Sequence, residues 1–216
     1  MSMKRVVLKE VSKNIKGTDV LNEISVEFEA GNIYGLCGRN GSGKTMLLRM
    51  IAGLIKPTKG EVYIDEKLLH RDIDFPENIG VMIENPEFWK EYTGMEALYS
   101  LASINKKIGM KEMEACMRRV ELDPLDKRTL RKYSLGMKKR LGIAQAIMEN
   151  PEIILLDEPS NALDKQGVEM IKNIILEKKR KGNLIIITSH RTEDLEVCDK
   201  IMELENGWMI EGETYE

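Results

Sequence analysis

The feature that most constrains the fold of this chain is a glycine-rich loop, residues 38–45, whose sequence GRNGSGKT fits the pattern G-x-x-x-x-G-K-[ST]. An apolar run, residues 33–37, precedes the loop and predicts a buried strand. Residues 46–54 follow it and predict a helix. Because this strand–loop–helix order is the context in which the pattern forms a phosphate-binding loop, we expect an α/β fold with a mostly parallel sheet.

The residues of the loop predict that its ligand is a nucleotide. Glycines let successive backbone N–H groups turn inward around anionic oxygens, and the start of the following helix adds unpaired N–H groups at the same place. Lys44 supplies a positive charge for the terminal phosphates, and the Thr45 hydroxyl can ligate the Mg²⁺ that accompanies a nucleotide. We therefore assign nucleotide contacts to Arg39, Asn40, Gly41, Ser42, Gly43, Lys44, Thr45 and Met46.

Two acidic residues and a histidine follow buried strands later in the chain. Asp157 and Glu158 come directly after the apolar run 153–156, and His190 follows the run 184–188. Because ligands bind at the carboxyl ends of strands in open α/β sheets, we expect these side chains beside the loop. Asp157 is predicted to hold Mg²⁺, directly or through water. Glu158 is predicted to accept a proton from an attacking water, and His190 to contact the γ-phosphate.

The charge, the apolar runs and the cysteines of the sequence indicate which partners and which cellular compartment fit such a site. The formal net charge of −3 offers no general attraction to nucleic acid or acidic lipid. We interpret the basic residues 178–181 as the solvated end of a helix over residues 164–181. The longest apolar runs are far shorter than the roughly 18 residues of a membrane span. Three widely spaced cysteines are typical of a reducing, cytoplasmic protein.

The other segments predict how one domain is organised. Residues 4–11 and 24–29 predict strands of an N-terminal antiparallel layer, separated by a polar segment, residues 13–19. An Asn-Gly turn at residues 206–207 predicts a terminal hairpin.

The helical periodicity of the middle of the chain predicts a subdomain. Residues 90–149 are expected to form a helical subdomain beside a core made of residues 1–89 and 150–216.

The order of these motifs resembles that of the ATP-binding cassette (ABC) family over essentially the whole chain. Residues 133–137, YSLGM, resemble the family's signature segment, residues 160–164 resemble its D-loop, and His190 resembles its switch histidine. The resemblance implies that two cassettes pack head to tail around two ATP molecules. Each ATP rests on the phosphate loop of one chain and is capped by Ser134 and Gly136 of the other.

The resemblance also implies a functional setting. It indicates an ATP-hydrolysing subunit on the inner face of the cell membrane, where it drives a separate multi-span membrane subunit that exports a substrate. Glu84 together with residues 134–138 resembles cassettes of bacitracin- and lantibiotic-type export and immunity systems. Two alternatives stay open: a soluble ABC ATPase that acts on ribosomes or chromosomes, and a nucleotide-dependent binding module that no longer hydrolyses ATP.

Four positions depart from the family pattern. Ile15 stands where the family usually stacks an aromatic residue on adenine, so we expect apolar contact instead. Glu84 replaces the glutamine that senses Mg²⁺ and touches the membrane partner. Its carboxylate can ligate a cation or water, but it adds negative charge near the γ-phosphate. Leu135 replaces the first signature glycine and Met137 the glutamine. Leucine costs more than glycine if the backbone there is left-handed.

Overall fold

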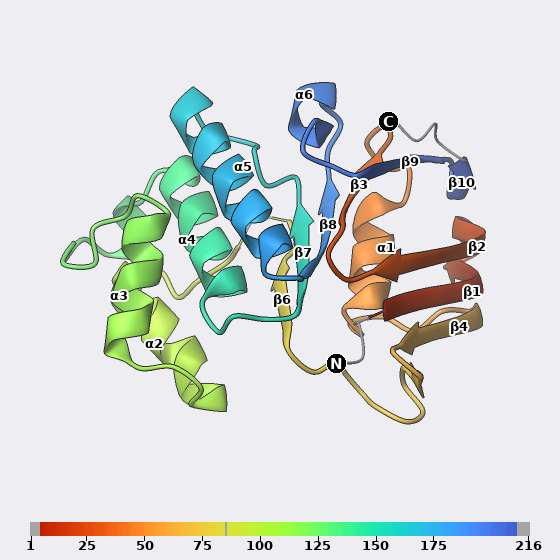
Figure 1. The fold of residues 1–216 in the computed structure, drawn as a ribbon, viewed down its shortest axis with the longest axis horizontal. Helices are drawn as coiled ribbons and strands as arrows, with labels where there is room; N and C mark the ends of the chain where they lie inside the picture. The colour runs from red at the N-terminus through yellow and green to blue at the C-terminus, as the bar shows by residue number, and fades with distance from the viewer. Residues whose placement is uncertain (1–4, 85, 211–216) are drawn as a thin grey trace.

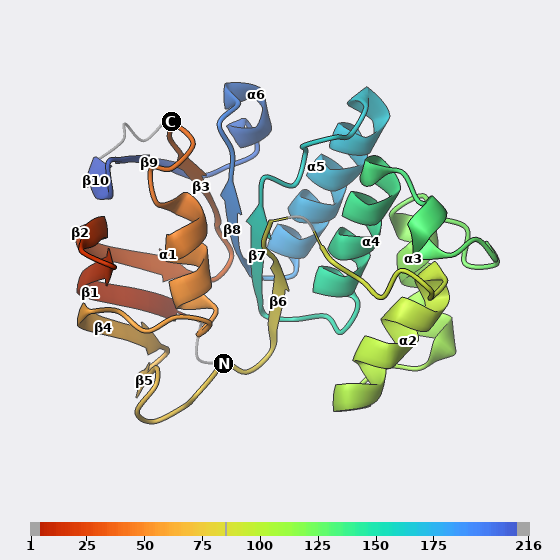
Figure 2. The same ribbon diagram turned by 180° about the vertical axis from the view of Figure 1, so that it is seen from behind.

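The fold is known from a computed structural model that describes residues 5–84 and 86–210. Lys4, where the first predicted strand begins, and Asn85 lie outside the described residues. Two sheets and a group of helices make up the molecule (Figures 1 and 2). Within the described residues, every helix is too short or too polar to cross a membrane.

A six-stranded sheet with the order β10-β9-β3-β8-β7-β6 forms the centre of the fold. All of its pairings are parallel except β10 with β9, which confirms the predicted α/β fold with a mostly parallel sheet. Its strands are β3 (Ile33–Cys37), β6 (Ile79–Met82), β7 (Ile153–Asp157), β8 (Leu184–Thr188), β9 (Lys200–Glu205) and β10 (Trp208–Ile210).

Both faces of this sheet are covered, which explains why its central strands are continuously apolar. Along β7, Ile154 and Leu156 pack into a cluster with the helices of the second half of the chain. Ile153 and Leu155 point the other way, into a cluster with the first helix and the antiparallel sheet. The sheet is therefore a fixed middle layer, and its carboxyl-terminal edge is free to carry a site.

The antiparallel sheet has the order β2-β1-β4-β5. Its strands are β1 (Arg5–Ile15), β2 (Thr18–Glu29), β4 (Lys59–Ile64) and β5 (Lys67–Leu68). The predicted polar break at residues 13–19 was wrong, because β1 and β2 continue to a tight turn and pair Asn14 with Asp19. The Asn14 side chain donates a 2.7 Å hydrogen bond to Asp19, so cross-strand polar contacts stabilise this part of the hairpin instead of burial.

The helices lie on two sides of the six-stranded sheet. Figure 1 shows α1 beside the antiparallel sheet, whereas α2, α3, α4 and α5 gather on the opposite side. The helices are α1 (Lys44–Ile51), α2 (Gly94–Asn105), α3 (Met110–Arg119), α4 (Leu135–Ile147), α5 (Lys165–Arg180) and α6 (Thr192–Leu195), with one 3₁₀ turn at Leu130–Lys132. This arrangement places the start of α1 and the start of α4 on different sides of the sheet.

The basic end of α5 differs in one respect from the prediction. Lys178 is 3% exposed, and its ammonium donates a 2.8 Å hydrogen bond to Asn150 Oδ1. Burial lowers the pKa of Lys178 below its ordinary value. The prediction of a solvated helix end was therefore wrong at this residue, because the last turn of α5 packs on the loop that precedes β7.

Candidate nucleotide site

The phosphate loop connects the end of β3 to the start of α1. Gly38 and Gly43 have φ values of 138° and 110°, which side chains rarely allow. A Cβ at Gly43 would also lie only 2.8 Å from Leu21 Cδ2 and 2.9 Å from the Val20 carbonyl oxygen. Gly43 is the N-cap residue of α1, and no side chain caps the first N–H groups of this helix. These N–H groups, at the positive end of the helix dipole, are therefore free to bind an anion at the loop.

Two polar side chains are buried inside the loop. Lys44 is 6% exposed, and its ammonium donates to the carbonyl oxygens of Gly38 (2.6 Å) and Arg39 (3.1 Å). Ser42 Oγ is buried and has no hydrogen-bond partner among the described residues. The fixed Lys44 ammonium, the Ser42 hydroxyl and the backbone N–H groups of the loop are together suited to bind the oxygens of a phosphate chain.

Asp157, at the end of β7, lies against Thr45 of the phosphate loop. Asp157 Oδ2 accepts a 2.9 Å hydrogen bond from Thr45 Oγ1, and Oδ1 accepts a 2.6 Å bond from Thr188 Oγ1. The carboxylate is thereby fixed, and Asp157 is 3% exposed. A hydroxyl beside a carboxylate is the hard-oxygen donor set that Mg²⁺ takes, so the residues present fit this ion.

Glu158 and His190 meet at the same edge of the sheet. His190 Nδ1 lies 2.9 Å from Glu158 Oε2, and the glutamate side chain is 18% exposed. Glu158 has a left-handed φ of 47°, and its N–H donates to Thr188 Oγ1 at 3.0 Å. The chain thus turns sharply after β7, and the second carboxylate points to the end of β8.

Glu84 follows β6, and its backbone, not its side chain, lies beside Asp157. Its N–H is 3.3 Å from Asp157 Oδ2, whereas its carboxylate forms a 2.8 Å ion pair with Arg49 of α1. The structure therefore brings the backbone of Glu84 to the Thr45–Asp157 pair and turns the side chain toward Arg49.

The chain is similar to known ABC transporter ATP-binding proteins. The family model described as ABC transporter matches residues 21–161. The chain is 47% identical to the ABC transporter ATP-binding protein YybJ of Bacillus subtilis (strain 168), over 91% of each chain. It is 36% identical to the bacitracin transport ATP-binding protein BcrA of Enterococcus faecalis, over 98% of this chain and 70% of BcrA.

Two further relatives extend the comparison. The lantibiotic transport ATP-binding protein SrtF of Streptococcus pyogenes is 30% identical, over 97% of this chain and 90% of SrtF. The solved dimeric structure of MJ0796, a bacterial ABC transporter cassette, aligns with a TM-score of 0.86 and 26% identity, over 97% of this chain and 100% of MJ0796.

The chain belongs to the ABC transporter family. It is an ATP-binding and ATP-hydrolysing subunit, as the order of its motifs predicted. The resemblance to the bacitracin and lantibiotic subgroup is also confirmed, since BcrA and SrtF are among its relatives.

The signature segment of this ABC subunit forms the start of α4. Ser134 caps the helix, and its hydroxyl accepts a 3.2 Å hydrogen bond from the Met137 N–H. Leu135 is the first residue of α4 and has a negative φ, so the cost of a leucine in left-handed backbone does not arise. Both Ser134 and Leu135 are exposed.

The signature segment also contacts the D-loop of its own chain. A Cβ at Gly136 would lie 3.0 Å from the carbonyl oxygen of Ala162. The D-loop is in turn fixed by Ser160, whose hydroxyl donates a 2.5 Å hydrogen bond to Asp194. Ser189, next to His190, donates to the same carboxylate oxygen at 2.8 Å, so the D-loop and the histidine segment share one anchor.

The remaining predicted contacts lie around the loop. Ile15 ends β1 at the tip of the hairpin and is 37% exposed, and the same hairpin carries Val20 and Leu21 to Gly43. Arg39, Asn40 and Gly41 are exposed on the loop, whereas Met46 is half-buried in α1.

Two residues of the site were missed from the sequence. Thr188 ends an otherwise aliphatic strand and pairs in register with Asp157, a signal that could have identified it. Lys139 of α4 is 3% exposed and donates to the carbonyl oxygens of Asp157 (3.1 Å) and Glu84 (3.4 Å). Burial lowers its pKa below the ordinary value. In the sequence, Lys139 stands next to Lys138, and nothing in the pattern distinguishes it from an exposed lysine.

Proposed function

We propose that this ABC subunit binds ATP with Mg²⁺ at the edge formed by the phosphate loop, β7 and β8. The observation that carries the proposal is that Thr45 pairs with Asp157 while Glu158 pairs with His190 at the same edge. Thr45 and Asp157 would hold Mg²⁺, which offsets the charge of the phosphates. Lys44 and the N–H groups at the start of α1 bind the phosphate oxygens.

Glu158 is the proposed base for hydrolysis. Its carboxylate takes a proton from water as the water oxygen bonds to the γ-phosphorus and the bond to the bridging oxygen breaks, which leaves ADP and phosphate. His190 holds this carboxylate through Nδ1. The ring can donate to Glu158 from Nδ1 and to the γ-phosphate from Nε2 at once only when both nitrogens carry protons.

We infer that a second ABC chain completes the site. Within one chain, α1 and α4 lie on opposite sides of the six-stranded sheet (Figures 1 and 2), so Ser134 cannot cap a nucleotide on its own loop. The start of α4 carries the Ser134 hydroxyl, on an exposed residue, and the N–H of Gly136, which is half-buried. In a head-to-tail pair these donors would meet the γ-phosphate on the partner's loop.

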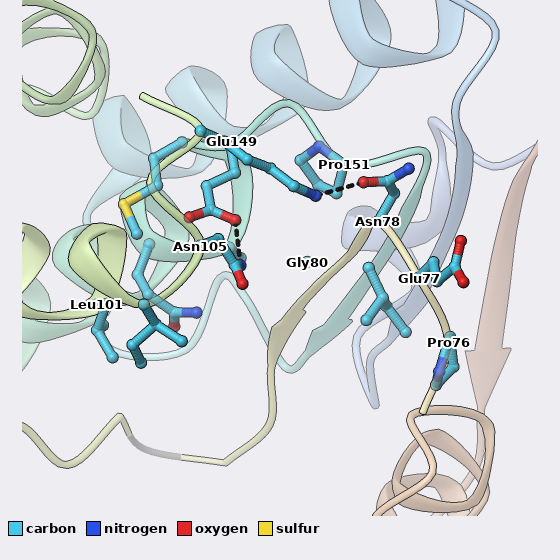
Figure 3. Close-up of a pocket in the computed structure, with 14 residues that line it drawn as sticks. Pro76, Glu77, Asn78, Gly80, Leu101, Asn105, Glu149 and Pro151 are labelled. Atoms are coloured by element: carbon cyan, nitrogen blue, oxygen red, sulfur yellow. Dashed lines mark hydrogen bonds between the residues drawn. The ribbon is translucent and has the colours of Figure 1, made fainter. Parts of the chain in front are cut away.

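We also infer that residues 90–149 form a helical subdomain beside the core of residues 1–89 and 150–216, and that a groove between them receives the membrane subunit. A cavity of about 550 Å³ lies there, and Figure 3 shows Asn78 and Gly80 on one wall with Asn105 and Glu149 on the other. Glu149 accepts from Asn105 through one carboxylate oxygen, and the other is buried without a partner among the described residues.

A second cavity, of about 300 Å³, lies along the same side of the fold. It shares Leu101 and Gln145 with the first and is also lined by Phe88 and Trp89. Trp89 is 73% exposed, which favours contact with another protein. We propose that a multi-span membrane subunit docks on both cavities and holds the chain at the inner face of the membrane. Relatives named for bacitracin and lantibiotic transport support a peptide-antibiotic exporter.

Two measurements test this function. Purified chain should release phosphate from ATP only when Mg²⁺ is supplied, and full activity without a divalent ion would refute the metal assignment. When expressed with its membrane partner, the chain should co-purify with that partner.

The docking groove is tested with Ile104→Asp, whose parent residue lines the first cavity and is 74% exposed, and with Trp89→Ala. Both variants should lose co-purification and keep the ATPase rate of the isolated chain. Leu125→Asp is the matched control, because Leu125 is 68% exposed and lines neither cavity. Equal loss in all three variants would contradict the location of the groove.

A further inference from the structure

One face of α1 contacts the ends of two different strands. Thr45 and Arg49 are four residues apart and therefore share this face. Thr45 Oγ1 reaches Asp157 Oδ2 at 2.9 Å, and one turn further Arg49 Nη2 reaches Glu84 Oε1 at 2.8 Å. The helix that starts at the phosphate loop thus fixes a metal-binding carboxylate with one residue and neutralises a second carboxylate with another.

The backbone of Glu84 is held from both sides. Its N–H lies 3.3 Å from Asp157 Oδ2, and its carbonyl oxygen accepts from the Lys139 ammonium at 3.4 Å. Its φ is 60°, in the left-handed region. Because the backbone is fixed in this turn, the carboxylate can move only by side-chain rotation, and Arg49 determines where it lies.

The negative charge at this edge makes the position of the Glu84 carboxylate important. Asp157 and Glu158 already place two carboxylates at the edge that receives a polyanion, and the Glu84 carboxylate lies one turn further along α1, against Arg49. Like charges oppose the binding of a triphosphate unless a cation offsets them. Lys44 faces the loop carbonyls, and the Lys139 ammonium contacts backbone carbonyl oxygens. Arg49 is the side chain that meets the Glu84 carboxylate directly.

We propose that Arg49 is a positioning residue that neutralises Glu84 and holds its carboxylate away from the phosphate-binding space. This inference rests on the proposed function, because it needs the nucleotide to lie on residues 38–45. Arg49 lets the site accept a triphosphate although the chain carries a glutamate after β6. Without Arg49, the Glu84 carboxylate is free to turn toward the phosphates and repels them.

The test is a double-mutant cycle on nucleotide binding, with Arg49→Met, Glu84→Gln and the double variant. Affinity for a non-hydrolysable ATP analogue with Mg²⁺ is measured by calorimetric titration. Arg49→Met should weaken binding by about fivefold, and by less for ADP, which lacks the γ-phosphate. In the Glu84→Gln background the same change should alter affinity less than twofold, because the carboxylate to be neutralised is gone. Arg49→Lys should retain most of the wild-type affinity, since it keeps the charge.

Each outcome decides whether Arg49 positions the Glu84 carboxylate or has only a structural role. Equal weakening by Arg49→Met with and without Glu84 would show that arginine acts through packing, and would overturn the proposal. Unchanged affinity in Arg49→Met would overturn it as well. Arg49→Gln serves as a second variant that retains a polar side chain. Arg118→Met is the control, because it removes the 3.0 Å pair with Glu114 on α3 and should leave binding unchanged.

The same titrations separate this inference from the proposed function. If the wild-type chain fails to bind the analogue, the placement of the nucleotide is wrong. If the wild-type chain binds it and the cycle shows no coupling between Arg49 and Glu84, only the role of Arg49 is wrong.

Discussion

The phosphate-loop end and the signature end of this molecule are built in different ways. At the loop end, functional side chains contact one another within the chain: Thr45 with Asp157, and Glu158 with His190. At the signature end, Ser134 and Leu135 begin a helix and face solvent. The fold itself therefore pre-organises one half of the site, whereas the other half is a surface that fits against a second molecule. Substitutions at the two ends should accordingly fail in different assays.

The largest effect is expected from Glu158→Gln at the loop end. The amide keeps the size of the side chain and cannot take a proton, so the ATPase rate should fall by about 10²-fold or more while ATP still binds. Phosphate release and a nucleotide-binding titration measure the two quantities separately. Wild-type turnover in this variant would remove Glu158 from its role as the base.

Lys44→Ala should weaken nucleotide binding in the isolated chain by about tenfold or more, because it removes a charged donor to the phosphates. Ser134→Ala should leave the same affinity unchanged, since Ser134 caps α4, and α4 and α1 lie on opposite sides of the six-stranded sheet. The comparison fails if Ser134→Ala weakens binding to the single chain as much as Lys44→Ala does.

A mixing experiment tests whether the two ends come from different chains. Lys44→Ala and Gly136→Asp chains should each be nearly inactive alone. When they are mixed in equal amounts, random pairing makes about half of the dimers mixed, and each mixed dimer contains one intact composite site of two. About a quarter of the wild-type ATPase rate should return if the sites act independently. No recovery, from chains shown to pair, would contradict a composite site.

The difference between the two ends also explains what the sequence could reveal. The loop, Asp157 and Glu158 were predictable because each ends or follows a strand whose apolar sequence marks it as buried. The parallel sheet then brings such strand ends to one edge, so adjacency in space follows from the order of motifs. His190 was predictable for the same reason, since it comes just after β8.

The orientation of individual side chains was not predictable in this way. Glu84 was expected near Mg²⁺, but its partner Arg49 lies 35 positions earlier in the sequence, on the helix of the loop. Lys139 and Lys138 are adjacent in the sequence and differ only in the face of α4 that each occupies. The hairpin at residues 13–19 was missed because polar cross-strand contacts leave no hydrophobic alternation.

The smallest effect is expected on the stability of the signature end. Ser134 caps α4 through the Met137 N–H, so Ser134→Ala should lower the free energy of unfolding by about 1 kcal/mol in urea denaturation. Ser134→Asn keeps an oxygen that can cap the helix, and should therefore keep the stability within a few tenths of a kcal/mol. Its amide is larger than the hydroxyl and should disturb the contact with a partner's nucleotide.

These two variants separate the structural role of Ser134 from its role between chains. With ATP and the Glu158→Gln background to prevent hydrolysis, sedimentation should show weaker pairing in both variants, although only Ser134→Ala is less stable. If the Ser134→Asn protein dimerised as tightly as the wild-type protein, the only role of Ser134 would be to cap α4. The capping of ATP would then fall to the N–H groups at the start of that helix, where the dipole acts without any side chain.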